Sequence, residues 1–529
     1  MKKYNTKTDF PHSAIVIGAG FGGLAAALRL RALGYQVTVI DKLDSPGGRA
    51  RIMSRGKFQY DAGPTVLTAP ILFEELFSLF DEKLEDFATL LPVEPWYRMQ
   101  FDDGATLDYN GDDAKLLAEI AKFSPADAQN YPKFKQHTEA IFKQGYEKYG
   151  SVAFNSWRMM FEALPALLKL RADRSVYHTT AHFFKHDAIR RAFSIQPLLV
   201  GGNPFNTTSI YSLIHFLERK WGVWFVKGGM GAMVQALVKL GERHGIEYRW
   251  NQTVVRLSVD PLLQKVNGVM LQNGQNIVAD LVVTNTDPAW INRSWLNEQS
   301  AGADTTKILG KPSFLQSINQ RVNQGIHQRI NQWFLNKRYK QSMSLFVWYF
   351  STRKQYPEVK HHTILFGKTY RETLQHIFNG NTVPTDLSVY LHRPNATDQQ
   401  STEHDSFYAL VPVPNLKADI DWKVQGELLK LHLCKTLEEK ILPDLHKELV
   451  DDFFITPEYF KEQLLSTDGA AFGIQPTFLQ SAKFRYANQH KRYKNLFFVG
   501  ANTHPGAGVP GVLLSAKVLE SLLKTQTMA

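Results

Sequence analysis

The sequence predicts an α/β fold in which a discontinuous, Rossmann-like dinucleotide-binding domain holds an inserted mixed-sheet domain and a helical segment. Three observations predict this fold. A strand, a glycine-rich turn and a helix follow one another over residues 13–34. A second strand, 36–40, leads into an acidic residue. A third buried strand, 495–500, precedes another glycine-rich loop and a helix, so the first and last stretches are expected to share one parallel sheet.

Residues 13–17 are small and β-branched, which is typical of a buried parallel strand. Gly18, Gly20 and Gly23 then fit the pattern G-x-G-x-x-G. Here Gly18 permits a tight turn, Gly20 lets a pyrophosphate approach bare backbone, and Gly23 lets the helix pack closely on the strand. The helix ends at Gly34, and its N-terminus offers the phosphates N–H groups and the positive end of its dipole.

Asp41 stands at the end of the second strand, 23 residues after Gly18. A carboxylate at this place accepts hydrogen bonds from the ribose hydroxyls of a bound dinucleotide. An ordinary strand–turn–helix unit would explain the glycines and leave Asp41 without a role. The combination therefore predicts a dinucleotide site.

Two further loops are expected at the same edge of the sheet. Gly47 and Gly48 allow a close approach to backbone, and Arg49 and Arg51 follow them, suited to pair with phosphate. Residues 58–65 form a strand that runs into a Gly-Pro loop. Ligands of this fold class bind at such carboxyl ends of strands.

Turn signals organise the middle of the chain. Residues 93–109 are expected to form two strands joined at Asp103-Gly104, and 246–287 several strands with turns at Asn267-Gly268 and Asn273-Gly274. A second glycine turn with a helix, at 227–240, lacks the dinucleotide spacing and is interpreted as structural. Further strands are expected at 344–350, 387–391 and 407–413, and a helix at 423–441.

These elements divide the chain into three parts. The dinucleotide-binding domain is expected at 1–92, 215–295 and 480–529, the substrate-binding domain at 93–111 and 296–479, and a helical subdomain at 112–214.

Within the helical subdomain, residues 157–174 combine apolar and basic positions. The apolar positions at helical spacing are Trp157, Met160, Phe161, Leu164, Leu167 and Leu168, and the basic ones are Arg158, Lys169, Arg171 and Arg174. Such a helix either lies in a membrane interface or packs on its own core. The residues alone leave both readings open.

Composition narrows the class of protein. The chain is 44% hydrophobic and 21% charged, which excludes wholesale disorder. It contains no apolar run long enough to span a membrane, and its N-terminus does not fit a signal peptide. The lone Cys434 forms no internal disulfide, so a cytoplasmic location is expected.

The net charge of +11 allows an anionic membrane surface as a partner. Nucleic acid is not expected, because the basic residues are scattered and no binding pattern occurs.

Several motifs together carry a resemblance to a known family. They are GAGFGGLAAALRL with PGGRA, FQYDAGPTVLT, FSIQPLLVGGNPF with SIYSLIHFLERKWGVWFVKGGMGA, HHTILFGKTYR and FFVGANTHPGAGVPGVLLSAK. The chain resembles the bacterial-type phytoene desaturases, carotenoid flavoenzymes of the wider amine-oxidase-like superfamily. The resemblance covers nearly the whole chain. The sequence differs from the family pattern at Asp41, where the family usually has Glu, and at Asn502, where relatives often have Gly.

The resemblance implies FAD as the cofactor and phytoene, taken from the lipid bilayer, as the substrate. The expected cofactor-binding residues are Gly18, Ala19, Gly20, Gly22, Gly23, Asp41, Lys42, Gly48, Arg49, Gly63, Pro64, Thr65, Val254, Gly500, His504, Gly508, Val509 and Pro510. His504 is expected to shape its loop or touch the flavin edge, in preference to acting as a base. No catalytic residue can be named, and no metal is expected.

The implied reaction passes a hydride to the flavin and its electrons on to oxygen or a quinone. Because phytoene resides in lipid, the resemblance favours membrane docking for the 157–174 helix and a peripheral membrane location. The alternatives are a carotenoid oxygenase, isomerase or saturase on the same scaffold, an amine oxidase, and a non-catalytic flavin- and carotenoid-binding protein.

Overall fold

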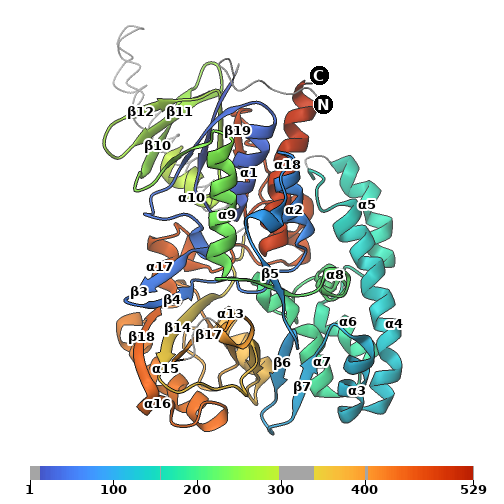
Figure 1. Ribbon diagram of the computed structural model, residues 1–529. Coiled ribbons are helices and arrows are strands. Elements are labelled where there is room, and N and C mark those ends of the chain that lie inside the picture. The colour runs from blue at the N-terminus through green and yellow to red at the C-terminus, as the bar shows by residue number, and fades with distance from the viewer. Residues whose placement is uncertain (1–11, 155–156, 297–338, 400–402, 528–529) are drawn as a thin grey trace, which may run out of the picture.

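The structure, a computed structural model, describes residues 12–154, 157–296, 339–399 and 403–527 (Figure 1). Residues 1–11 of the predicted dinucleotide-binding domain, 297–338 of the predicted substrate-binding domain and the final two residues lie outside this description, as does the side chain of Trp157.

A parallel five-stranded sheet collects segments from across the whole chain. Its order is β19 (Leu496–Phe498), β13 (Leu281–Thr284), β1 (Ser13–Ile17), β2 (Gln36–Ile40) and β9 (Glu247–Arg249). The strands are rich in Val, Ile and Leu because both faces are covered. Helices α1 (Phe21–Ala32), α9 (Met230–Arg243) and α18 (Val509–Thr527) share its largest core.

The register of this sheet brings its loops together. Ile17 pairs with both Ile40 and Thr284, and Thr284 pairs with Phe498. The carboxyl ends of four strands therefore lie in line at one edge, where the predicted ligand loops begin.

An antiparallel three-stranded sheet follows β9. It consists of β10 (Val254–Asp260), β11 (Lys265–Leu271) and β12 (Asn276–Val278), and the predicted turn at Asn273-Gly274 is confirmed. The predicted turn at Asn267-Gly268 is wrong. Both residues lie inside β11, where a Cβ on Gly268 would come within 2.0 Å of the Ile277 carbonyl oxygen. Gly268 thus serves close strand approach, a role that sequence does not distinguish from a turn.

A mixed seven-stranded sheet forms the second large unit. Its order is β18 (Leu449–Ile455), β14 (Ser344–Thr352), β17 (Asp405–Val413), β16 (Val389–His392), β15 (His362–Leu365), β6 (Tyr97–Gln100) and β7 (Thr106–Tyr109). Among the described strand pairs of this sheet, only β15–β6 is parallel. Helix α15 (Trp422–Lys440), close to its predicted bounds, packs Trp422, Leu429 and Leu433 into one core with Trp348.

The helices of segment 113–221 lie on one side of the molecule, at the right of Figure 1. They are α3 (Asp113–Phe123), α4 (Pro125–Phe142), α5 (Trp157–Lys169), α6 (Val176–Phe183), α7 (Asp187–Ser194) and α8 (Leu213–Trp221). Within the described residues, no helix is both long and apolar enough to cross a bilayer.

Candidate functional site

One cavity runs from the carboxyl edge of the five-stranded sheet to the seven-stranded sheet. The predicted cofactor residues that line it are Gly18, Gly20, Gly22, Asp41, Lys42, Gly48, Arg49, Gly63, Pro64, Thr65, Val254, His504, Gly508, Val509 and Pro510. The apolar end of the cavity is lined by Met343, Leu345, Val347, Ile364 and Leu410 of the sheet and by Met160, Ala163 and Leu167 of α5. Polar loops and an apolar wall thus face one shared space.

The glycine loop after β1 offers backbone without side chains. A Cβ on Gly20 would lie 2.8 Å from Nδ2 of Asn285, so no larger residue fits there without displacement. Among the described residues, no side chain caps the N-terminus of α1, which begins directly after Gly20. A phosphate placed there meets unpaired N–H groups and the positive end of the helix dipole.

Asp41 is buried and already holds the loops around it. Its Oδ2 accepts a hydrogen bond from the Ala19 N–H at 2.7 Å, and its Oδ1 accepts one from the Leu43 N–H at 2.9 Å. Burial raises the pKa of the Asp41 carboxyl above its ordinary value. Since each carboxylate oxygen has two lone pairs, both can still accept from ribose hydroxyls.

The basic residues near the glycine loop contact protein groups as well as the cavity. The Arg49 guanidinium donates to the Ala471 carbonyl at 2.8 Å and to Ser466 Oγ at 3.1 Å. Lys42 donates to the Glu462 carbonyl at 2.7 Å. Arg51 pairs with Asp44 at 3.3 Å. Arg51 does not line the cavity. Arg49 and Lys42 therefore join the dinucleotide edge to segment 462–471, which the sequence did not indicate.

The Gly63–Thr65 loop is held by tyrosines of the seven-stranded sheet. Tyr408 donates to the Gly63 carbonyl at 2.7 Å, and Tyr349 donates to the Ala62 carbonyl at 2.8 Å. The hydroxyls of Thr65 and Tyr390 lie 2.7 Å apart. The loop thus belongs to the contact between the two sheets.

His504 lies in the loop between β19 and α18. It is buried, its Nε2 lies 3.2 Å from the Tyr149 carbonyl oxygen, and its ring packs on Phe154. Burial lowers its pKa to about 4. This ring packs against the loop and the Tyr149 carbonyl, and its role in shaping the loop or touching the flavin edge stays a prediction.

Three predicted residues do not line the cavity. Ala19 donates its N–H to Asp41, and Gly23 packs so closely that a Cβ would lie 1.9 Å from the Gly18 carbonyl oxygen. Gly500 has a positive φ of 98°, and a Cβ there would meet Asn285 Oδ1 at 2.3 Å. These three residues therefore contact residues that line the cavity without lining it themselves.

Among the lining residues that the sequence did not indicate, three polar ones stand out. Asn285 follows β13 and fills the space between Gly20, Gly22 and Gly500. Gln252 and Glu218 also line the cavity, and Gln252 Oε1 is buried without a hydrogen-bond partner in the described part of the chain. An unpaired buried acceptor, bare glycine backbone and an uncapped helix fit a dinucleotide ligand. A polar residue after the third parallel strand was the available signal for Asn285.

Comparisons with known proteins cover nearly the whole chain. A family described as flavin containing amine oxidoreductase matches residues 21–309. The chain is 42% identical over 512 residues to a lycopene-forming phytoene desaturase of Pseudescherichia vulneris, across 96% of this chain and 98% of that protein. It is 38% identical over 517 residues to a neurosporene-forming phytoene desaturase of Rhodobacter capsulatus, across 96% and 93%.

Among solved structures, a putrescine oxidase with bound putrescine shares the fold, with a TM-score of 0.61 at 13% identity over 98% of each chain. The resemblance seen in the motifs is therefore confirmed over nearly the full length, and the dinucleotide is a flavin, FAD. The chain belongs to the phytoene desaturase family of flavin-containing amine oxidoreductases.

Proposed function

We propose that this protein is an FAD-dependent carotene desaturase that converts phytoene stepwise to more conjugated carotenes of the lycopene or neurosporene type. The observation that carries the proposal is the cavity that joins the dinucleotide loops to an apolar wall. An oily polyene offers almost nothing to hydrogen-bond, so it needs such a wall. The full-length similarity to phytoene desaturases names the substrate class.

The chain's own residues would hold the cofactor along the polar loops. Gly20 and the N-terminus of α1 would receive the pyrophosphate, Asp41 the ribose, and the backbone near Val254 the adenine. The N-terminal residues of α18, Val509 and Pro510, line the cavity and would place a positive dipole end beside the flavin ring. When bound, FAD accepts a hydride from an allylic carbon, and its electrons pass on to oxygen or a quinone.

The apolar wall excludes water and orients the polyene. Leu345 and Val347 of β14 line the cavity together with Met343, which precedes this strand, and Leu410 of β17 lies on the neighbouring strand. Loss of a proton from the carbon next to the hydride donor then completes each new double bond.

Helix α5 supports a route for substrate from a membrane. Met160 and Ala163 are buried at the cavity, while Phe161 and Leu168 on the same helix are 66% and 55% exposed. One helix therefore presents apolar side chains both to the cavity and to the outside. We propose that α5 docks on the bilayer, helped by basic residues such as Arg158 and Lys169.

Incubation of the purified holoprotein with phytoene in liposomes tests this function. Absorbance should move from the ultraviolet into the visible as the polyene lengthens, with oxygen or quinone required and NAD⁺ dispensable. An oxygenated or isomerised product with unchanged polyene length would identify one of the alternative enzymes. Binding of phytoene without flavin reduction under anaerobic conditions would identify a non-catalytic carrier.

A further inference from the structure

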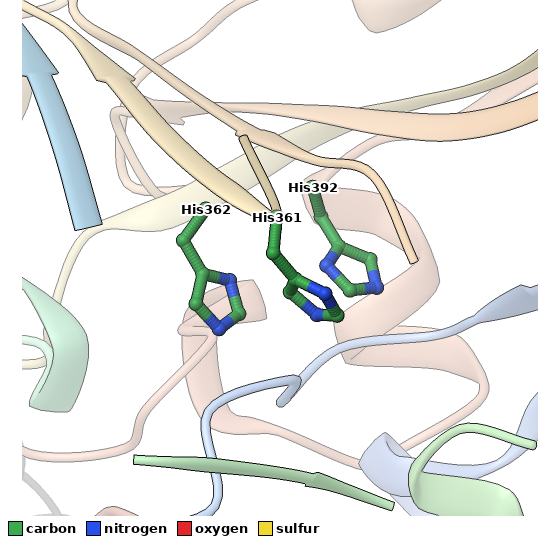
Figure 2. Close-up of side chains that lie close together, drawn as sticks. All are labelled: His361, His362 and His392. Atoms are coloured by element: carbon green, nitrogen blue, oxygen red, sulfur yellow. The ribbon is translucent and has the colours of Figure 1, made fainter. Parts of the chain in front are cut away.

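Three buried histidines meet at the end of two neighbouring strands in the seven-stranded sheet. His362 opens β15 and pairs directly with His392, which closes β16, and His361 precedes β15. Figure 2 shows the three side chains extending from these strand ends with their rings next to one another. Each residue is at most 3% exposed, and one ring nitrogen of each lies within 4.8 Å of the other two.

The outward nitrogens of two of these rings have partners. His361 Nδ1 lies 2.7 Å from Thr397 Oγ1, and His362 Nδ1 lies 2.6 Å from the Tyr390 hydroxyl. In contrast, Nε2 of His361, Nε2 of His362 and both nitrogens of His392 have no hydrogen-bond partner among the described residues. Burying a polar atom without a partner is unfavourable, so this concentration of unpaired nitrogens points to a bound ligand.

A chain of hydroxyls fixes which nitrogen of His362 carries the proton. The Gly63 carbonyl can only accept, so Tyr408 donates to it at 2.7 Å. Tyr408 then accepts from Thr65 at 3.2 Å, and Thr65 accepts from Tyr390 at 2.7 Å.

Tyr390 must therefore accept from Nδ1–H of His362. This tautomer leaves a lone pair on Nε2, which points away from the chain of hydroxyls. A metal-binding histidine is oriented in the same way, by donating its other ring N–H to a neighbour.

The distances between the ring nitrogens of the three histidines suit a bound metal ion. If the three nitrogens formed an equilateral triangle with sides of 4.8 Å, its centre would lie about 2.8 Å from each nitrogen. Bonds of about 2.0–2.1 Å to Zn²⁺ then need each ring to move by less than about 1 Å.

A carboxylate is also at hand. Asp61 Oδ2 lies 3.8 Å from His392 Nε2, and within the described ranges His392 is the one ion-pair partner of Asp61. Asp61 Oδ1 is occupied by the Met230 N–H at 2.8 Å. Asp61 Oδ2 therefore lies next to the three rings and can supply an oxygen ligand.

We propose that His361, His362 and His392 bind one divalent transition-metal ion, with Asp61 as the fourth ligand. Three imidazoles and one carboxylate in a compact, water-poor site favour tetrahedral Zn²⁺. The Phe225 ring, 4.6 Å from that of His361 between centroids, covers one side. The ion would tie the loop that begins at Asp61 to the seven-stranded sheet, so its role is structural, and the proposal is independent of the substrate.

Metal analysis of untagged, dialysed holoprotein is the first test. We expect close to one Zn²⁺ per chain. Metal-depleted protein titrated with Co²⁺ should develop the intense visible bands of a four-coordinate site, saturating at one equivalent, and Zn²⁺ should abolish them. Flavin content, measured on the same samples, reports folding independently of activity.

Variants locate the ion. His392→Gln and His361→Gln should each lose stoichiometric metal and the Co²⁺ bands. The control His446→Gln removes a histidine that is 65% exposed and should keep both. Failure of wild-type protein to bind Zn²⁺ or Co²⁺ would overturn the proposal and assign the space to buried water. Retention of metal by His392→Gln with normal flavin content would place the ion elsewhere and overturn it equally.

Discussion

Tyr97 of β6 donates a hydrogen bond to Oε1 of Glu218 in α8 at 2.8 Å, and this contact joins the seven-stranded sheet to a helix on the cavity wall. Glu218 is 1% exposed, and its second oxygen has no partner among the described residues. Burial raises the pKa of its carboxyl from 4.5 to about 7.

The Glu218 carboxyl should make stability depend on pH. A carboxyl whose folded pKa lies above its unfolded value stabilises the fold below pH 4.5, and this stabilisation is lost as pH rises to about 7. Relative to Glu218→Gln, the unfolding free energy of wild-type protein should therefore fall by up to about 3 kcal/mol over that window. Urea unfolding of both proteins across the range measures it. A constant difference would show that folding does not shift the pKa of Glu218.

The glycine loop gives a test of cofactor retention. In Gly20→Val even the Cβ would lie 2.8 Å from Nδ2 of Asn285, and the side chain would enter the path proposed for the pyrophosphate. The variant should purify without flavin absorbance. Gly56→Val is the control, because nothing lies within 4 Å of a Cβ there. It should keep the flavin although its positive φ costs stability. Normal flavin content in Gly20→Val would refute the placement.

Asp41 tests the ribose contact. Asp41→Ala should weaken FAD binding by about 1–3 kcal/mol, because ribose hydroxyls and two backbone N–H groups lose their acceptor. Titration of apoprotein with FAD, followed by flavin fluorescence, gives the dissociation constant. Asp44→Ala, whose side chain is 67% exposed, should leave it unchanged. An unaltered constant in Asp41→Ala would mean that Asp41 does not contact the cofactor.

Membrane docking predicts a specific loss of lipid binding. Wild-type protein should sediment with anionic liposomes and be released in part by high salt, because screening removes only the electrostatic share. The double variant Phe161→Ser and Leu168→Ser should bind less with normal flavin content. Leu262→Ser with Leu263→Ser is the control, since these leucines are 94% and 73% exposed in the turn after β10. Equal losses in both pairs would contradict a docking role for α5.

Short sequence patterns correctly predicted the first two strands of the five-stranded sheet, which carry the glycine loop and Asp41. The strands at 13–17 and 36–40 have the predicted bounds, because the β-branched runs, the glycines and the helix between them occupy one continuous segment. The paired strands around Asp103-Gly104 are confirmed for the same reason.

Features that depend on distant pairing were not predicted. Strand β18 contains Asp451 and Asp452 and gains its partner only from β14. The histidine cluster arises from the register of β15 against β16, which aligns residues 30 positions apart. The predicted apolar positions of the 157–174 helix do not form one face, because Met160 turns to the cavity and Phe161 to the outside.

The five-stranded sheet also constrains when the cofactor site can form during synthesis. β1 and β2 leave the ribosome first, but β13 closes their flank only after residue 281, and β19 with the His504 loop follows some 200 residues later. Until then the nascent chain lacks one wall of the flavin pocket. We therefore expect cofactor loading to follow translation, and a ribosome-stalled chain ending before β19 should emerge as an apoprotein with an open sheet edge.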